Sequence, residues 1–461
     1  MYTQEKNTVV KTRTAVIVAS FIIAILFIAF AAVIYFSDKE DLTEDGIRAN
    51  LESLTEDKGY EYACSYITEI GIKSFDKIKF INIETYYQHL YVGNLPSTLE
   101  LAKGTVSLYL EYFYNDLINS NDTNKITDAL INCYVASTGD RYGYYRNETE
   151  NTEYDESTSG EYVGIGVTVL TDPDENGNIV IISTSKNSPA EEAGILPGDV
   201  IVSVDGKAVS EIGSEAAASL IKGPSGTTVL IGIKRGEELL SLTVERRIVA
   251  EQSVSYSVID GNVGLVSISG FKSNTPDQFR EAIDALEEAD VKAIVFDVRN
   301  NPGGLLTSII NVLEYLVPTG TRIMSYSTLD GRELVEYAED DAENSDHVIK
   351  VPLAVLCNKH TASAAELFTA ALRDYDSMGI LDVITVGERT FSKGVMQATY
   401  TLSDKTSITL TIAFYNPPSG VNYDGVGVIP DYEAPTDVEF AELPGYAADL
   451  IFTPNSAENA A

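Results

Sequence analysis

Two apolar segments that each lead directly into a helix constrain the fold of this chain more than any other feature. Val291–Val298 is a nearly continuous apolar run, as expected of a strand with both faces covered, and Leu305–Leu316 has the pattern of a helix. Leu353–Cys357 and Ala362–Tyr375 repeat this order. The repetition predicts a mainly parallel sheet with right-handed crossover helices. In such a core, ligands bind at the carboxyl ends of the strands.

One more strand and helix belong to the same α/β core, which we expect to occupy residues 251–435. Val263–Ser267 has the pattern of a strand. Thr275-Pro-Asp-Gln278 has the form of a capping box, in which the first and fourth side chains bind free helix amides. The helix that follows carries apolar residues on one face, namely Phe279, Ile283 and Leu286.

A serine hydroxyl, a lysine amine and a glutamine amide follow the second strand, in that order. Ser363 lies at the start of the predicted helix, Lys393 follows thirty positions later, and Gln397 four positions after that. A serine hydroxyl is a weak nucleophile until a base removes its proton, and a neutral lysine amine can be that base. Gln397 faces the same way as Lys393 in a strand or a helix, so its amide can orient the amine. The set indicates serine–lysine hydrolysis of peptide bonds.

The lysine can act as a base only if its pKa is lowered. A free lysine has a pKa of ~10.4, so a neutral amine at pH 7 costs about 4.6 kcal/mol. Burial changes lysine pKa values by that much. Phe391, Val395 and Met396 give Lys393 an apolar setting. We therefore expect activity to rise with pH as Lys393 loses its proton.

These residues, together with Asp297-Val-Arg-Asn-Asn-Pro-Gly-Gly304, resemble the carboxyl-terminal processing peptidases, also called tail-specific proteases. The resemblance runs from about Gly139 to Pro435. It includes Gly387-Glu-Arg-Thr-Phe391 before the lysine and Gly425-Val-Gly-Val-Ile-Pro-Asp431 near the end of the domain.

The resemblance implies a role for each site residue. Ser363 is the nucleophile, Lys393 the general base and Gln397 its orienting partner. The backbone N–H groups of Gly303 and Ala364 form the oxyanion hole. Acyl transfer through Ser363 then needs no metal and no cofactor.

Four neighbouring residues raise further points. Ala365 stands where many family members have a second serine, and Ser392 stands where a glycine is usual. His360, three residues before Ser363, is a less suitable base because it lies on the turn between strand and helix. We expect Glu366 on the helix surface or beside the helix dipole, without a catalytic role.

Residues 156–248 have the pattern of a small β-rich module. Ser188-Pro-Ala-Glu191 supplies an N-cap serine, a proline at the first helical position and a capping-box glutamate. A second helix is expected at roughly Ser214–Lys222. The expected strands are Tyr162–Val169, Ile179–Ser183, Gly198–Gly206 and the hairpin of Thr228–Lys234 with Leu239–Val244. This arrangement resembles a PDZ domain.

The PDZ resemblance implies a site for the end of a peptide. The loop would present backbone N–H groups to a terminal carboxylate, and the edge strand after it would take the peptide as an added strand. Glycines allow the close approach. The loop residues are Val163, Gly164, Ile165, Gly166 and Val167. The implied partners are protein substrates with free, accessible and largely apolar C-termini.

The N-terminus carries a candidate membrane anchor. Residues 15–36 contain no charge and are long enough to cross a bilayer. Lys6, Lys11 and Arg13 precede this segment, and acidic residues follow it, so the positive-inside rule places residues 1–14 in the cytoplasm and the rest outside. A cleaved signal peptide is the alternative, because Ala29-Phe-Ala31 has the form of a cleavage site. The long apolar run favours an uncleaved single-pass anchor in the cell membrane.

The remaining segments carry no predicted chemistry. Residues 37–150 are expected to be helical and are compatible with a homo-oligomer; residues 147–160 are expected to form a mobile connector, and residues 436–461 a C-terminal tail. The net charge of −37 argues against nucleic-acid binding. No metal-ligand spacing occurs, and three cysteines do not make a disulfide framework, although a Cys64–Cys133 bridge stays open.

The leading hypothesis is a membrane-anchored serine endopeptidase that acts outside the cytoplasmic membrane on C-terminal tails. One alternative is a tethered PDZ receptor whose peptidase fold only binds. A hydrolase of small acyl substrates is another, which the PDZ pattern disfavours.

Overall fold

A computed structural model describes residues 43–117, 122–170, 173–327, 329, 331–339 and 347–453. They form two compact units, one from the described part of residues 43–147 with Gln397–Thr411 and the other from the described part of residues 148–396 and 412–453. The predicted anchor and cytoplasmic stub lie outside the described residues. Among the helices that are described, none has the length and apolar character to cross a membrane.

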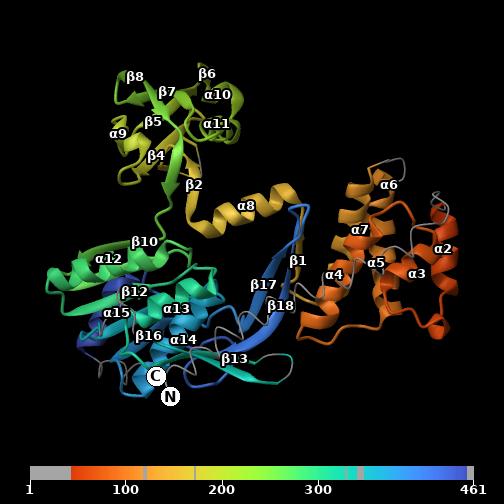
Figure 1. The fold of residues 1–461 in the computed structure, drawn as a ribbon. Helices are drawn as coiled ribbons and strands as arrows, with labels where there is room; N and C mark the ends of the chain where they lie inside the picture. The colour runs from red at the N-terminus through yellow and green to blue at the C-terminus, as the bar shows by residue number, and fades with distance from the viewer. Residues whose placement is uncertain are drawn as a thin grey trace, which may run out of the picture. The chain divides into compact units, whose positions relative to one another are not determined.

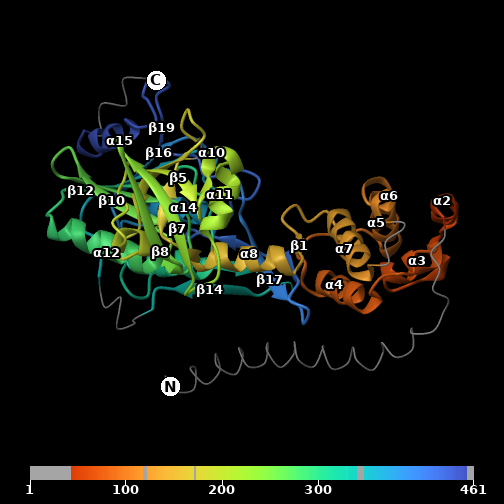
Figure 2. The same ribbon diagram turned by 90° about the horizontal axis from the view of Figure 1, so that it is seen from above.

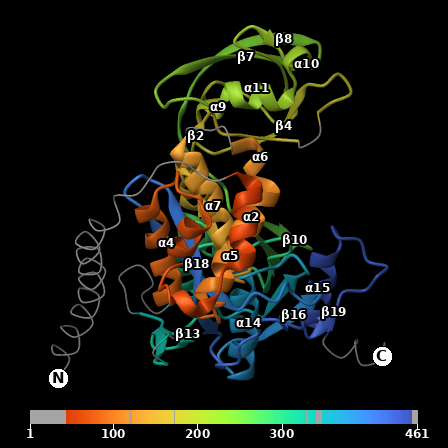
Figure 3. The same ribbon diagram turned by 90° about the vertical axis from the view of Figure 1, so that its right-hand side faces the viewer.

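The first unit confirms the predicted helical N-terminal region (Figure 3). Ser97 begins one helix with a capping box, and Asp76 and Asp122 cap two others through their side chains. Its helices are α2 (Glu44–Ser53), η2 (Glu56–Lys58), α3 (Ala63–Ile70), α4 (Lys77–Leu90), α5 (Thr98–Tyr112), α6 (Tyr114–Leu117) and α7 (Thr123–Ser137). Cys64 and Cys133 are free, buried thiols in this unit, so the two cysteines do not form the disulfide bridge that the sequence left open.

A long hairpin carries the chain between the two units. It consists of β17 (Val395–Thr401) and β18 (Ser407–Asn416). In the first unit, β1 (Tyr144–Arg146) pairs antiparallel with the start of β18. In the second unit, β13 (Arg322–Ser327) pairs with the end of β18 and with β14 (Glu333–Tyr337).

The expected mobile connector at residues 147–160 is wrong, because the segment forms a helix, α8 (Glu148–Ser159). Glu148 and Glu150 in the first turn interact favourably with the helix dipole. Asn151 donates to Asp155 one turn on, at 3.3 Å. The helix is polar on nearly all sides, so it has no apolar stripe from which to predict it.

The predicted PDZ module forms a six-stranded sheet in the order β3-β4-β5-β7-β8, with β6 paired to β5 (Figure 1). The expected strand over Tyr162–Val169 is two strands, because Gly166 has a φ of 81° and breaks it. The elements are β2 (Glu161–Gly164), β3 (Val167–Val169), β4 (Ile179–Thr184), α9 (Pro189–Glu192), β5 (Val200–Val204), β6 (Lys207–Ala208), α10 (Val209–Ile212), α11 (Ser214–Ile221), β7 (Thr228–Arg235), β8 (Glu238–Glu245) and β9 (Arg247–Ala250). Strand β2 pairs with β9.

The α/β core confirms the predicted, mainly parallel sheet. Its order is β10-β11-β12-β15-β16-β19, and only the β10–β11 pair is antiparallel. The strands are β10 (Val254–Ile259), β11 (Val263–Ile268), β12 (Ala293–Asp297), β15 (Leu353–Cys357), β16 (Val383–Gly387) and β19 (Tyr432–Glu433).

Helices cover both faces of this sheet (Figures 1 and 2). Helices α12 (Thr275–Glu288), α13 (Leu306–Glu314) and α14 (Ala364–Ser377) build the larger buried cluster on one face. Within the expected C-terminal tail, α15 (Leu443–Phe452) packs on the other face. Burial on both faces explains the apolar sequences of β12 and β15.

The helix predicted after Thr275 is present, but its capping box is wrong. Gln278 accepts hydrogen bonds from the main-chain amides of Ser253 and Val254 at 2.9 and 3.0 Å, instead of capping its own helix. The Thr275 hydroxyl accepts from the Lys272 amide at 2.8 Å. The Gln278 side chain therefore fixes the entry into β10, a contact that local sequence does not specify.

Candidate active site

Ser363 occupies a strained turn between β15 and α14. Its backbone has φ 56° and ψ −119°, a conformation that costs a non-glycine residue about 1–3 kcal/mol and is concentrated at functional sites. Its side chain is half-buried. The Ala364 amide that follows donates to no acceptor within the described part of the chain. A free N–H at a helix start is suited to bind developing negative charge.

The turn after β12 places Gly303 against the Ser363 turn. A Cβ built on Gly303 would lie 2.8 Å from Ser363 Cβ and 2.9 Å from the Ala364 nitrogen. The two predicted oxyanion-hole residues are thus brought together. The Gly303 amide, however, donates to Asn301 Oδ1 at 2.8 Å. Asn301 is fully buried, and its Nδ2 donates to the Ile268 carbonyl oxygen at 2.9 Å.

Glu366 is not on the helix surface as expected, because its side chain is fully buried. Its Oε2 accepts hydrogen bonds from the main-chain amides of Ser363 at 2.9 Å and Lys393 at 2.7 Å. Its Oε1 accepts from the Ser392 amide at 2.7 Å and from the Thr390 hydroxyl at 2.5 Å. One carboxylate therefore joins the nucleophile segment to the lysine segment. The Ser-x-x-Glu spacing was the only signal for this contact.

Lys393 lies in the segment between β16 and β17. Its side chain is half-buried, and Val395 beside it is buried. Phe391 was expected in the same apolar pocket but is 42% exposed. Ser392 has a φ of 84°, which explains physically why a glycine suits this position.

Gln397 belongs to the first compact unit, whereas Lys393 and Ser363 belong to the second. Within the first unit, Gln397 Nε2 donates to Thr411 Oγ1 at 3.4 Å. Thr411 is held by Asp140, which accepts from the Thr411 amide at 2.9 Å and from its hydroxyl at 2.8 Å. The orienting role of Gln397 stays a prediction.

His360 lies on the turn before Ser363 with its side chain exposed. Its main-chain amide donates to Asn358 Oδ1 at 3.0 Å. Asn358 also accepts from the Asn300 amide at 3.0 Å, so it ties the two strand-end turns together.

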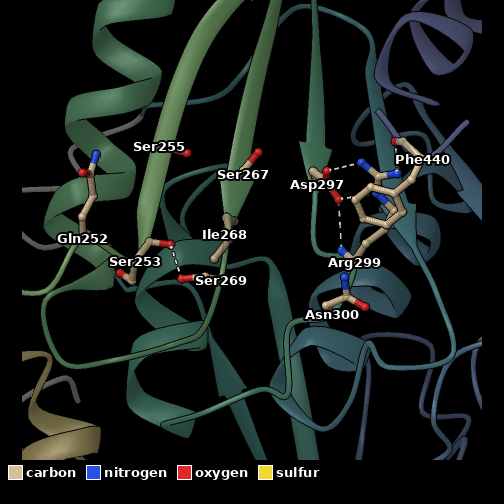
Figure 4. A pocket seen from close by; sticks show the side chains of 10 residues that line it. All are labelled: Gln252, Ser253, Ser255, Ser267, Ile268, Ser269, Asp297, Arg299, Asn300 and Phe440. Carbon is tan, nitrogen blue, oxygen red and sulfur yellow. Dashed lines mark hydrogen bonds and ion pairs between the residues drawn. The ribbon is translucent and has the colours of Figure 1, made fainter. Parts of the chain in front are cut away.

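A cavity of about 260 Å³ opens at the carboxyl ends of β11 and β12 (Figure 4). Asp297 binds the Arg299 guanidinium through both carboxylate oxygens, at 2.8 and 2.6 Å. Arg299 also donates to the Phe440 carbonyl oxygen and stacks on its ring. This pairing fixes the start of the turn that leads to Gly303. The other lining residues are Gln252, Ser253, Ser255, Ser267, Ile268, Ser269 and Asn300.

The predicted carboxylate loop of the PDZ domain is shorter than expected. Val163 and Gly164 belong to β2, and Val167 opens β3, which leaves Ile165 and Gly166 as the turn. The amides of Ile165 and Gly166 donate to no acceptor within the described residues. Strand β3 is at an edge of its sheet, so the edge expected to receive a peptide is present.

Within the described ranges, no cluster of three or more His, Cys, Asp or Glu side chains is arranged to hold a metal ion.

Comparison with known proteins identifies the family. The model of peptidase family S41 matches residues 262–434, and a PDZ domain model matches residues 180–235. The chain is 33% identical over 326 residues to a probable CtpA-like serine protease of Staphylococcus haemolyticus, covering 70% of this chain and 63% of that protein. It is 32% identical over 343 residues to the carboxy-terminal processing protease CtpA of Bacillus subtilis, covering 74% and 71%. A solved photosystem II D1 C-terminal processing protease is 26% identical, with a TM-score of 0.45 over 79% of this chain and 94% of that one.

A PDZ domain followed by an α/β serine-peptidase core is the class that this fold and these matches define. The chain belongs to peptidase family S41, as a CtpA-like C-terminal processing serine peptidase with a PDZ domain. This chain spans less than two thirds, 63%, of the length of the Staphylococcus haemolyticus relative.

Proposed function

We propose that this protein is a membrane-anchored serine endopeptidase that acts outside the cytoplasmic membrane. It processes or degrades proteins from accessible apolar C-terminal tails, which its PDZ domain recognises. Ser363 is the nucleophile and Lys393 the general base of a serine–lysine dyad, with Gln397 orienting the lysine.

The observation that carries this proposal is the shared carboxylate of Glu366. The amides of Ser363 and Lys393 donate to the same oxygen atom, so a nucleophile and a base start from adjoining main-chain positions. The strained backbone of Ser363 supports the same reading, because strain of this kind is retained where function requires it.

The reaction proceeds by acyl transfer. Lys393 accepts the hydroxyl proton as Ser363 Oγ bonds to the scissile carbonyl carbon, and the lysine returns that proton to the leaving amine. The developing oxyanion is bound by the Ala364 amide and by the Gly303 amide, which must exchange its bond to Asn301 for the substrate. Water then attacks the acyl-enzyme, releases the new C-terminus and restores the serine hydroxyl.

Substrate selection by the PDZ domain rests on its open strand edge. Strand β3 offers main-chain groups to an added strand, and the amides of Ile165 and Gly166 are available to a terminal carboxylate. Val167 and Val169 of β3 are only partly buried against the domain core, as is Leu220 of α11. Apolar side chains of a bound tail would pack there.

The anchoring proposal rests on residues 15–36, which are uncharged and follow Lys6, Lys11 and Arg13. Cleavage after Ala31 would release the catalytic region on the same side of the membrane. The N-terminal sequence of the mature protein, read from isolated membranes, distinguishes the two.

The proposed function is tested with a folded reporter that carries an unstructured tail ending in apolar residues. Shortening of the tail is followed by mass spectrometry for the wild type, for Ser363→Ala and for a reporter whose terminal carboxylate is amidated. We expect cleavage by the wild type and loss of cleavage in both controls. Binding of the reporter without cleavage would instead favour a tethered PDZ receptor.

A further inference from the structure

Two buried tyrosines lie behind the Ser363 turn, and none of the roles above uses them. Tyr415 is at the end of β18, and Tyr423 is in the segment that follows. Only 3% of Tyr415 and 6% of Tyr423 is exposed. Their rings meet edge to face, with centroids 5.9 Å apart.

The two phenols connect the nucleophile to the base. Tyr423 Oη donates to Tyr415 Oη at 3.0 Å and lies 3.4 Å from the Ser363 carbonyl oxygen. Tyr415 Oη donates to the Lys393 carbonyl oxygen at 3.1 Å. Burial raises the pKa of Tyr415, and hydrogen bonding by the Tyr423 and Ser363 side chains opposes that rise. The two phenols therefore join the main chain of the nucleophile turn to the main chain of the base.

This connection differs from the one made by Glu366. The carboxylate binds main-chain amides of Ser363 and Lys393, whereas the two phenols lie against the carbonyl oxygens of the same two residues. The peptide groups on both sides of the Lys393 α-carbon are thus held. A hydroxyl that must meet an amine within a few tenths of an ångström benefits from such restraint, because small displacements of reacting groups cost large factors in rate.

Both phenols remain protonated in the working range of pH. Burial raises the pKa of Tyr415 and the pKa of Tyr423 above the ordinary tyrosine value. Neither phenol can then serve as a general base, so each contributes a hydroxyl that donates one hydrogen bond and accepts others.

We propose that Tyr415, supported by Tyr423, is a positioning residue that fixes the Ser363 turn relative to Lys393 for acyl transfer. The inference rests on the proposed function, because it assumes that these two residues react. It adds a pair of hydroxyl groups to the machinery that the family resemblance implies.

The test uses isosteric variants of the full-length protein in detergent. Tyr415→Phe and Tyr423→Phe each remove one hydroxyl and keep the ring. Tyr375→Phe is the matched control, because Tyr375 is a fully buried tyrosine on α14 whose hydroxyl donates to the Arg322 carbonyl oxygen at 3.2 Å. For each variant, kcat and KM on the tailed reporter, the rate of covalent labelling by a fluorophosphonate and the thermal midpoint are measured.

We expect Tyr415→Phe to lower kcat and the labelling rate together by about tenfold or more, with KM within about twofold of the wild type. Tyr423→Phe should lower both about threefold, and Tyr375→Phe should change neither. A Tyr415→Phe enzyme as active as the Tyr375→Phe control would overturn the inference, as would a loss that appears only in KM. If Tyr415→Phe does not fold, the kcat and labelling rate of Tyr423→Phe are compared with those of Tyr375→Phe, and equal values would overturn the inference.

Failure of the proposed function would look different. A wild type that neither cleaves the reporter nor reacts with the fluorophosphonate would remove the assumed nucleophile. An active wild type with unaffected tyrosine variants would leave the peptidase in place and exclude only the phenol network.

Discussion

The turns after β12 and after β15 have the same topology, but they contribute different groups to the site and are held by different contacts. Each follows a buried parallel strand and leads into a helix of the same core. The first turn contributes main chain alone, through Gly303, and is fixed from within by the neighbouring Asn301 side chain. The second contributes a side chain, Ser363, and is fixed from outside by Glu366, which also binds the segment of Lys393.

The difference follows from what each turn must present. A donor N–H needs close approach to its neighbour, and glycine permits this because it has no Cβ. A nucleophile needs a side chain in an exposed orientation, so the backbone of Ser363 carries strain that other contacts must offset. One turn is therefore sensitive to added volume and the other to lost hydrogen bonds.

The largest effect is expected from Gly303→Ala. The new Cβ would lie 2.7 Å from the Ala362 carbonyl oxygen and 2.8 Å from Ser363 Cβ, at a φ of 100°. We expect activity to fall at least about 100-fold, because the Ser363 turn must move by a fraction of an ångström or more. Rates of fluorophosphonate labelling measure this directly.

The control for that variant is Gly320→Ala. Gly320 has a φ of 85°, but nothing lies within 4 Å of its built Cβ. It should lose about 1 kcal/mol of stability and no activity. Equal losses of activity in the two variants would show that backbone strain, and not contact with Ser363, explains the first result.

The next effect comes from the second turn, through Glu366→Gln. The amide keeps one acceptor oxygen but directs an NH2 group at donors from Ser363, Lys393, Ser392 or Thr390. Losing charge-assisted hydrogen bonds of a buried group costs about 2–3 kcal/mol of stability. We expect kcat to fall about 100-fold with little change in KM.

Glu314→Gln is a matched control for Glu366→Gln. Glu314 is a buried carboxylate on α13 that accepts the Glu339 amide at 3.3 Å. It should lose stability without losing kcat. Chemical unfolding and steady-state kinetics on both variants separate the two roles, and a normal kcat in Glu366→Gln would contradict the assigned role of its carboxylate.

The local pattern of the sequence was sufficient to predict the strands and helices that flank both turns. The bounds of β15 match the prediction, because five consecutive apolar residues fit a strand that is covered on both faces. The proximity of Gly303 to Ser363 also follows from sequence, since parallel strands end at one edge of a sheet.

The contacts that fix the turns could not be predicted in this way. Glu366 has the spacing of an ordinary capping residue, and only the return of Thr390–Lys393 from distant sequence buries it. Asn301 and Gln278 likewise bind partners set by tertiary packing. Helix α8 was missed because its sequence has no apolar period.

A smaller effect, of opposite sign, is expected from Ser392→Gly. Ser392 has a φ of 84°, which costs a residue with a Cβ about 1–2 kcal/mol. Glycine keeps the amide that donates to Glu366 and removes this cost, so we expect about 1 kcal/mol of added stability and unchanged kcat. Ser392→Ala keeps the strain and loses only the hydroxyl. An increase in stability with alanine as well would assign the effect to the hydroxyl.

An effect confined to stability extends the comparison to a second buried glutamate that binds helix amides from a distance. Glu84 on α4 accepts from the amides of Ala63 at 2.6 Å and Cys64 at 3.1 Å, at the start of α3. Burial raises its pKa to about 8, against the opposing effect of those two hydrogen bonds. Between its unfolded pKa near 4.5 and about 8, the folded state holds a proton that the unfolded state lacks.

Stability of the helical unit should therefore fall as pH rises through this window, by at most about 1.4 kcal/mol per pH unit. Glu84→Gln cannot ionise and keeps one acceptor, so its unfolding free energy should not show that slope. Chemical unfolding at pH 5, 6.5 and 8, followed by helix content, compares the two proteins. A slope of the same size in the variant would mean that a group other than Glu84 titrates in this range.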